Sequence, residues 1–238
     1  MINGNPGQRV VVHQADVPWQ ASPSSQVLRK RFHLVGPTES GQVTSLVRYQ
    51  AGAAFPRHGH PGGEEILVLN GIFSDEAGDW PAGTWFLNPE GFSHSPYSTG
   101  GCLLFVKLRQ YSGVEHRAIS FQSLMPTRCQ GYDLLVLDEH GDEMTAIVDV
   151  SAGEVSLPAD GGAEGLVLSG KLSLWGETLT THDWFRVPPG ERLQVISAGC
   201  RLYLKRGAVK LLLTEHAVSD GAAVEDGAGA HHGGSSGV

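Results

Sequence analysis

Short apolar runs separated by turn residues dominate the chain. Segments 43–49, 65–69, 85–87 and 102–108 are apolar or alternate apolar with polar positions, and glycine, proline, asparagine or serine interrupts the sequence between them. Runs of this length and spacing are typical of β-strands. No convincing stretch of the sequence shows the 3.6-residue apolar period of a helix. The pattern predicts an all-β fold made of small barrels or sandwiches.

The same pattern occurs twice. Residues 44–52 (TSLVRYQAG) match 145–153 (TAIVDVSAG) at an offset of 101, and residues 62–71 (GGEEILVLNG) match 161–170 (GGAEGLVLSG) at an offset of 99. Two further blocks recur in the same order, TWFLNPEG with DWFRVPPG and GCLLFVKL with GCRLYLKR. Four ordered matches indicate an internal repeat, and they predict two tandem domains of one design.

We expect these domains at 41–110 and 131–213, joined by a linker at 111–130. Residues 1–40 contain VVVHQADVPW and VLRKRFHLV, which we expect to add strands that cover a sheet edge. The tail at 219–238 is small, polar and rich in glycine. Such a segment buries too little apolar surface to offset its chain entropy, so we expect it to be disordered.

Composition narrows the functional classes. With 17 basic and 25 acidic residues the net charge is −8, and no basic stripe is present, so we do not expect a nucleic-acid partner. The three cysteines form no CxxC motif, which argues against a disulfide framework. No apolar run approaches the roughly 18 residues of a membrane span, and no signal peptide is evident. We expect a soluble cytoplasmic protein. A homodimer is compatible with this composition.

Candidate metal ligands gather in one segment of the first copy. His58 and His60 lie two residues apart, so they share a face if the segment is extended. A Pro-Gly-Gly turn then leads to Glu64 and Glu65, and His94 follows in the motif NPEGFSH. Three imidazoles and one carboxylate suit a divalent transition metal such as Zn, Fe, Mn, Ni or Cu. We expect isolated histidines elsewhere to be ordinary core or surface residues.

The two neighbouring glutamates are distinguished by the repeat. The second copy keeps a glutamate at the Glu65 position, as Glu164, but has Ala163 at the Glu64 position. The copy that lacks the histidines therefore also lacks the first glutamate. This shared loss predicts that Glu64 is the metal ligand and that Glu65 faces away from it, because successive strand residues point to opposite faces.

The second copy has lost the whole ligand set. Its residues at the positions of His58, His60, Glu64 and His94 are Leu157, Ala159, Ala163 and Leu193. We expect the second copy to be a metal-free structural partner. The alternative is an apolar ligand in a metal-free cavity.

The spacing of the candidate ligands resembles two cupin motifs. The residues Gly52, His58, His60, Glu64 and Gly71 follow the first motif, GX5HXHX3–4EX6G. The segment GTWFLNPEGFSH, from Gly83, resembles the second motif, GX5PXGX2HX3N, except that Ser98 replaces the closing asparagine. The amino-acid sequence of residues 57–98 resembles the cupin module of ChrR-type anti-sigma factors and their stand-alone relatives, which are often double cupins.

This resemblance implies a bicupin of two small jelly-roll barrels that holds one divalent metal at His58, His60, Glu64 and His94. Zinc or Fe(II) is expected there, with Mn or Ni as further choices. Four ligands allow a closed tetrahedral site or a six-coordinate site with two open positions.

Three functions follow from the resemblance. The first is an enzyme acting on a small oxygenated molecule, such as an iron-dependent dioxygenase or isomerase of dicarbonyl compounds. The second is a ChrR-like zinc-binding regulatory or sensor module, and the third is a structural double cupin. The sequence has no HxxxCxxC motif of the sigma-binding kind, so we do not expect it to sequester a sigma factor.

Overall fold

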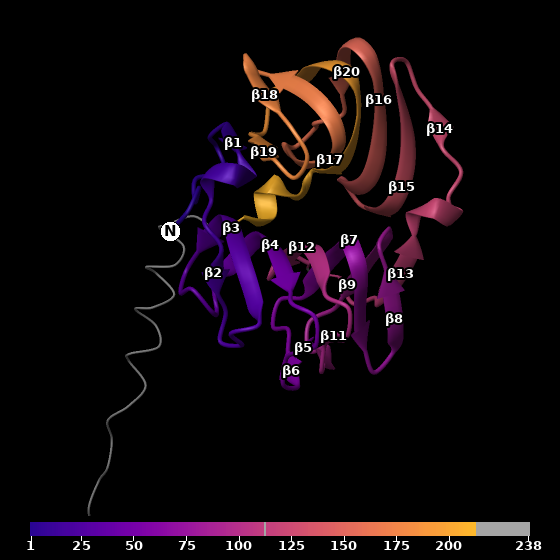
Figure 1. The fold of residues 1–238 in the computed structure, drawn as a ribbon. Coiled ribbons are helices and arrows are strands. Elements are labelled where there is room, and N and C mark those ends of the chain that lie inside the picture. The colour runs from indigo at the N-terminus through magenta and orange to yellow at the C-terminus, as the bar shows by residue number, and fades with distance from the viewer. Residues whose placement is uncertain (112, 213–238) are drawn as a thin grey trace, which may run out of the picture.

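The computed structural model describes residues 1–111 and 113–212, which form two β-rich domains (Figure 1). The described residues contain no α-helix, and their three short 3-10 helices are η1 (Gln14–Asp16), η2 (Phe121–Ser123) and η3 (Ala208–Leu211). No helix in this part of the chain is long and apolar enough to cross a membrane. The predicted all-β fold is confirmed. The tail predicted at 219–238 lies outside the described residues.

The first domain is a ten-stranded antiparallel sheet with the main path β13-β9-β7-β12-β4-β3-β2, accompanied by the two-stranded pair β6 and β10. Its strands are β2 (Gln20–Ala21), β3 (Val27–Val35), β4 (Gln42–Tyr49), β5 (Ala53–Ala54), β6 (His58–Gly59), β7 (Glu64–Asp75), β8 (Gly78–Pro81), β9 (Thr84–Asn88), β10 (Ser93–His94), β11 (Tyr97–Ser98), β12 (Cys102–Leu108) and β13 (Arg117–Ser120). The strand β3, which lies within the first 40 residues, is therefore an integral part of this sheet.

The second domain repeats this arrangement in an eight-stranded sheet with the main path β1-β19-β17-β20-β16-β15-β14, and its eighth strand, β18, pairs with β17. Its strands are β1 (Val10–Val12), β14 (Thr127–Arg128), β15 (Tyr132–His140), β16 (Glu143–Leu157), β17 (Ala163–Leu174), β18 (Glu177–Leu179), β19 (Trp184–Val187) and β20 (Leu193–Arg206). The strands β4, β7, β9 and β12 correspond to β16, β17, β19 and β20, as the sequence repeat predicts.

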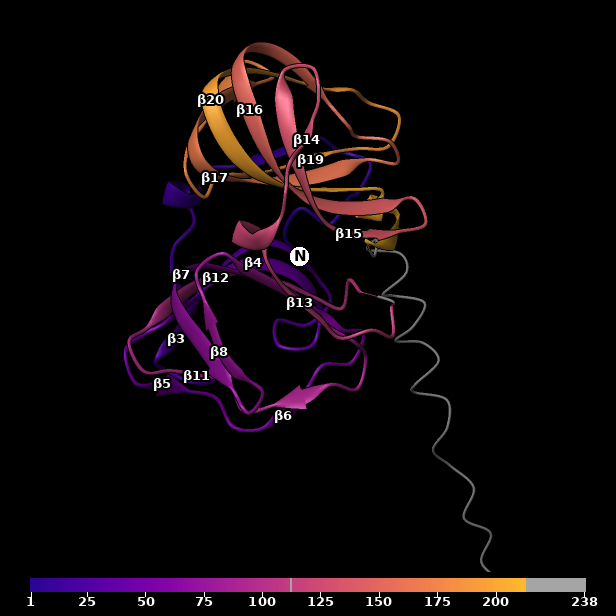
Figure 2. The same cartoon turned by 90° about the vertical axis from the view of Figure 1, so that its right-hand side faces the viewer.

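The two domains exchange their edge strands. The strand β1 precedes the first domain in sequence but pairs with β19 of the second, with Val11 opposite Phe185. The strand β13 leads toward the second domain but pairs with β9 of the first, with Ala118 opposite Phe86. Figure 1 shows both crossings, with β1 beside the upper domain and β13 beside the lower one, and Figure 2 shows β13 in the lower domain from another side. The N-terminal strand β1 thus covers a sheet edge of the second domain.

Successive side chains of a central strand point to opposite faces and pack in separate hydrophobic cores. On β7, Ile66 packs inside the first domain, whereas Leu67 packs in a core formed by both domains. The second domain contributes Leu166 and Tyr203 to this shared core. The ring of Tyr203 lies 5.2 Å from that of Phe105 in an edge-to-face contact. Phe105 and Tyr203 are counterparts in the repeat, so the two copies meet through equivalent surfaces.

Two reciprocal ion pairs cross this interface. Lys205 Nζ lies 2.7 Å from Glu65 Oε2, and Lys107 Nζ pairs with Glu164 Oε2. Glu65 and Glu164 are repeat counterparts, as are Lys107 and Lys205, and all four side chains are at most 5% exposed. Burial opposes ionisation of Glu65, but the nearby lysines outweigh it and lower the pKa of this carboxyl. Each glutamate that faces away from its own barrel is therefore held by a lysine of the other domain.

We expect Lys107→Met to lower the free energy of unfolding by about 3–5 kcal/mol, because it leaves the Glu164 carboxylate buried without its cation. Adding Glu164→Leu should restore most of the loss, since the double variant removes both buried charges. Urea unfolding monitored by tryptophan fluorescence measures both changes. A double variant as unstable as the single one would show that the lysine stabilises the fold through something other than this pair.

Candidate metal centre

Three histidines from separate elements of the first domain converge. His58 on β6 lies opposite His94 on β10 in the antiparallel register, and His60 follows two residues after His58. One ring nitrogen of each lies within 4.8 Å of the others, and His60 Nε2 is 3.0 Å from His94 Nε2. Burial, followed by the nearby His94 and His58, lowers the pKa of His60 to about 3, which keeps its imidazole neutral. Neutral imidazoles are the form that binds metal.

Glu64 joins these histidines at the start of β7. Its Oε2 lies 3.4 Å from His60 Nε2 and 3.7 Å from His94 Nε2, and it accepts a hydrogen bond of 2.9 Å from Asn88 Nδ2. Burial raises the pKa of the Glu64 carboxyl, although His94 and Asn88 oppose this effect. No lysine or arginine in the described part of the chain forms an ion pair with Glu64. A divalent cation would supply the charge that this buried carboxylate lacks.

The Nδ1 atoms of His58 and His94 already have hydrogen-bond partners. His58 Nδ1 lies 2.8 Å from the carbonyl oxygen of Pro56, and His94 Nδ1 lies 3.2 Å from Asp75 Oδ2. These contacts place the proton on Nδ1 and leave Nε2 free as a ligand, which is the usual arrangement around a metal-binding histidine. Asp75 also accepts a hydrogen bond of 3.2 Å from Trp80 Nε1.

Sequence reasoning missed Asp75, and it also treated His116 as an ordinary histidine. His116 Nδ1 lies 3.0 Å from Asn88 Oδ1, and the Asn88 amide in turn donates to Glu64. The His116 ring stacks on Phe92 with centroids 5.3 Å apart. Neither residue stands at a fixed spacing from the histidine motif, so the sequence carried no signal for them beyond their chemistry.

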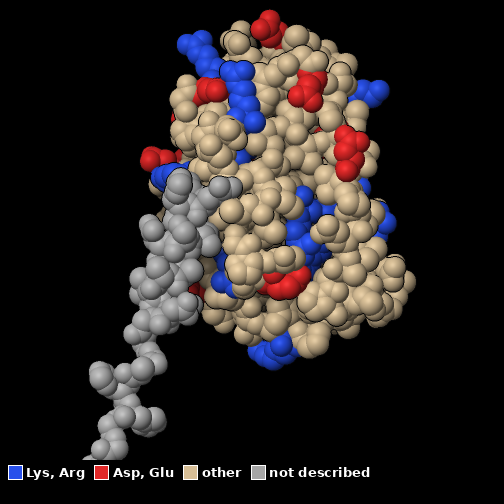
Figure 3. Space-filling model, turned by 90° about the vertical axis from the view of Figure 1, so that its left-hand side faces the viewer, with Lys and Arg blue, Asp and Glu red and all other residues tan. Residues whose placement is uncertain are grey.

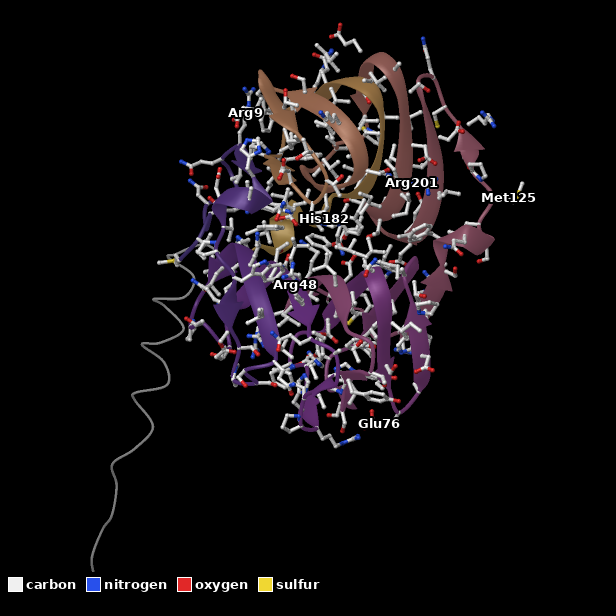
Figure 4. The ribbon with its side chains drawn as sticks, viewed as in Figure 1. Arg9, Arg48, Glu76, Met125, His182 and Arg201 are labelled. Carbon is white, nitrogen blue, oxygen red and sulfur yellow. The ribbon has the colours of Figure 1, made fainter. Side chains whose placement is uncertain are left out.

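The loops that carry the histidines are fixed to one another. Glu76 Oε1 pairs with Arg57, directly before His58, while Glu76 Oε2 accepts a hydrogen bond from the backbone of Ser95, directly after His94. Figure 4 labels Glu76 at the end of the first domain that lies away from the second domain. The glycine turn matters as well, because Gly63 has φ +73° and a Cβ there would lie 2.7 Å from the Tyr111 carbonyl oxygen. Only glycine fits this turn, which leads directly into Glu64.

A cavity of about 290 Å³ opens onto the four candidate ligands. Apolar residues such as Ile66 and Val106 line it, and Phe55 lies beside His58 with ring centroids 5.4 Å apart. Tyr49 also lines the cavity, and burial raises the pKa of its phenol, so the hydroxyl stays protonated. The shape and lining suit a small molecule with an apolar body and polar ends.

The second domain has no such arrangement at the equivalent place. The residues that replace the four candidate ligands all belong to its hydrophobic core, and they are Leu157, Ala159, Ala163 and Leu193. The predicted loss of the ligand set thus corresponds to a packed apolar interior. Glu164, next to Ala163, faces the domain interface, just as Glu65 does in the first domain.

Residues 7–112 match the family model described as the ChrR cupin-like domain. Over these residues the first domain is similar to ChrR cupin-like domains. The resemblance that the two histidine motifs indicated is therefore confirmed for this part of the chain. No curated protein sequence matches the chain.

Solved structures extend the likeness to the two domains together. A proposed dioxygenase of Nostoc punctiforme superposes with a TM-score of 0.68 at 13% identity, over 84% of this chain and 82% of that one. A bacterial pirin of Escherichia coli in complex with nickel(II) gives a TM-score of 0.62 at 15% identity, over 83% and 98%. Oxalate decarboxylase of Bacillus subtilis gives 0.61 at 13% identity, over 84% and 76%. At these identities the likeness shows the fold, which is the predicted double cupin.

Asp75→Asn should weaken metal binding by about 10–100-fold, because the His94 Nδ1–H would lose its charged acceptor while the side-chain volume is kept. Asp79→Asn is the matched control, since Asp79 bonds Ser74 and contacts no histidine. Competition of each variant with a chromophoric chelator for Zn²⁺ or Co²⁺ gives the two affinities. Equal affinities in the two variants would contradict the role assigned to Asp75.

Proposed function

We propose that the first domain binds one divalent transition metal through His58, His60, Glu64 and His94, and that the protein uses this metal to act on a small oxygenated molecule. The observation that carries the proposal is the buried carboxylate among three converging imidazoles, on the wall of a cavity large enough for a small ligand. The Nδ1 contacts of His58 and His94 support it, since they orient both rings for metal binding.

The protein's own groups define what the site can do. A divalent ion held here would act as a Lewis acid toward a carbonyl, enolate or carboxylate oxygen. Glu64 would be the one anionic ligand, so the site would keep a net charge near +1 and favour an anionic or enolised ligand. The apolar residues Ile66 and Val106 limit water around the bound molecule, and the protonated Tyr49 hydroxyl is a hydrogen-bond donor in the same cavity.

An iron(II)-dependent oxygenase or isomerase of dicarbonyl-type compounds is the form of this activity that we favour. Iron(II) suits a site of imidazoles and one carboxylate that keeps positions open. The fold likeness to a proposed dioxygenase is compatible with this choice, and the likeness to a nickel-bound pirin is compatible with other divalent ions. Zinc, manganese and nickel therefore belong in the same test.

A zinc-binding regulatory or sensor module is the second candidate. The match of residues 7–112 to the ChrR cupin-like family favours it. In this case the same four ligands would hold zinc, and ligand binding in the cavity would be read by a partner protein. The two candidates share the metal and differ in turnover.

Elemental analysis should find one tightly held metal per chain, because the second copy has lost all four ligands. The measurement is best made with His231 and His232 replaced by alanine, which removes adventitious metal binding by that adjacent pair.

Glu64→Gln should lower the metal affinity by well over about 100-fold, the upper limit of the range for changes to residues that only contact a ligand. Glu65→Gln should stay within that range, because Glu65 bonds Tyr203 and Lys205 of the other domain. Two metals per chain, or a reversed order of the two glutamates, would overturn the assignment.

The enzymatic form is tested by oxygen uptake. The protein, purified anaerobically and loaded separately with Fe(II), Mn(II), Ni(II) and Zn(II), is mixed with a panel of 1,2- and 1,3-diketones and hydroxyketones. We expect uptake with Fe(II) and none with Zn(II), and we expect Glu64→Gln to abolish it. Absence of both oxygen uptake and substrate isomerisation with every metal would rule out the enzyme and leave the sensor.

A further inference from the structure

Two arginines project into the cavity that opens onto the metal centre. Arg29 and Arg31 stand two residues apart on β3, so they share the strand face that lines the cavity. The Arg31 side chain is only 4% exposed and that of Arg29 is 19% exposed. On the side of the molecule that Figure 3 shows, Lys and Arg atoms gather in a recess of the first domain with Asp or Glu atoms beside them. Arginines buried to this degree require an anionic partner.

The present anionic partner of both arginines is a single carboxylate from a loop, and Arg31 also donates a hydrogen bond to Gln20. Glu39 Oε2 lies 2.7 Å from Arg29 Nη1, and Glu39 Oε1 lies 3.1 Å from Arg31 Nη2. Each carboxylate oxygen therefore serves one guanidinium. The Glu39 side chain is 48% exposed, far more than either arginine, so it reaches the pair from the solvent side. A carboxylate entering from solvent could occupy the same position.

The repeat provides an internal comparison. The strand registers align Arg29 with Leu134 and Arg31 with Val136, so the copy without metal ligands also lacks the arginine pair. The loop that carries Glu39 spans residues 36–41, whereas its counterpart is reduced to residues 141–142. The arginine pair, the loop carboxylate and the metal ligands thus occur together in the first copy and are absent together from the second.

The arginine pair lies within reach of the metal centre. The Arg29 guanidinium carbon is 6.0 Å from the centroid of the Phe55 ring, and this ring centroid is 5.4 Å from that of His58. One small molecule could therefore contact a metal at one end and the guanidinium groups at the other, with the apolar wall between them.

We propose that Arg29 and Arg31 form a carboxylate-binding subsite, that the small molecule taken by this cavity carries a carboxylate at the end away from the metal, and that Glu39 occupies the subsite until this ligand displaces it. The metal end of the ligand rests on the proposed function, whereas the carboxylate end rests on the arginines and Glu39 alone. The planar fork of arginine favours a carboxylate in the geometry that Glu39 already shows.

Calorimetric titration of the full-length protein with pentanedioate tests the carboxylate end, because this diacid needs no metal to pair with the arginines. We expect Glu39→Gln to bind pentanedioate about tenfold more tightly than the parent, since the internal competitor loses its charge. We expect Arg29→Gln to bind it about tenfold more weakly. The control is Glu154→Gln, which removes an exposed carboxylate of the second domain, outside the cavity lining, and should leave the affinity unchanged. Equal affinities in the parent, Glu39→Gln and Arg29→Gln proteins would overturn the proposal.

The metal end is tested separately with the Co(II)-loaded protein and two matched acids. The acids 2-oxopentanedioate and 2-oxopentanoate present the same 2-oxo acid group and differ only in the distal carboxylate. We expect both to change the Co(II) absorption spectrum, and we expect the diacid to bind about tenfold more tightly in a manner that Arg29→Gln abolishes. If neither acid alters the spectrum while pentanedioate binding still responds to Glu39→Gln, the metal function fails and the subsite stands. If both acids alter it with equal affinity, the subsite fails and the metal centre stands.

Discussion

The reciprocal ion pairs between the domains determine which way the central strands face. A central strand such as β7 has one face in its own barrel and the other in the shared core. Apolar side chains alone would pack in either core, so they do not define the orientation of the strand. Glu65 and Glu164 remove this ambiguity, because each finds its lysine only across the interface. A register shift by one residue would place Glu65 in the barrel interior and Glu64 at the interface. The buried charges at the interface therefore also fix Glu64 beside the histidines.

The two copies use one scaffold for different purposes. In the second domain the positions of the candidate ligands are filled by leucine and alanine, and the interior is a continuous apolar core. The first domain instead keeps a cavity, a buried carboxylate and two buried arginines. Such groups are costly to bury, and the apolar partner contributes a packed core and a large shared interface. This division lets the first domain retain buried polar groups that contribute less to the stability of the fold than apolar side chains would.

Much of this arrangement could be predicted from the sequence. The fold class and the shared face of His58 and His60 followed from short-range spacing, because strand alternation and turn residues act locally. The repeat was visible from matching blocks in the two halves, and His94 was assigned by its motif. Asp75 and the arginine pair were not found, because their roles depend on long-range pairing of strands. Arg29, for example, reaches the cavity because β3 joins the sheet beside β4, and a single sequence does not reveal which strands become neighbours. The exchange of β1 and β13 was missed for the same reason.

The exchange of edge strands imposes an order on biosynthesis. The first domain can complete its sheet soon after residue 120 leaves the ribosome, since β13 follows it directly in the chain. The strand β1, although made first, must wait for β19, whose last residue is Val187. At translation rates of roughly 5–20 residues per second, the intervening stretch of about 175 residues takes on the order of 10–35 s. For that interval three consecutive valines have no strand to pair with, so the nascent chain carries an exposed, aggregation-prone segment until its own second half emerges.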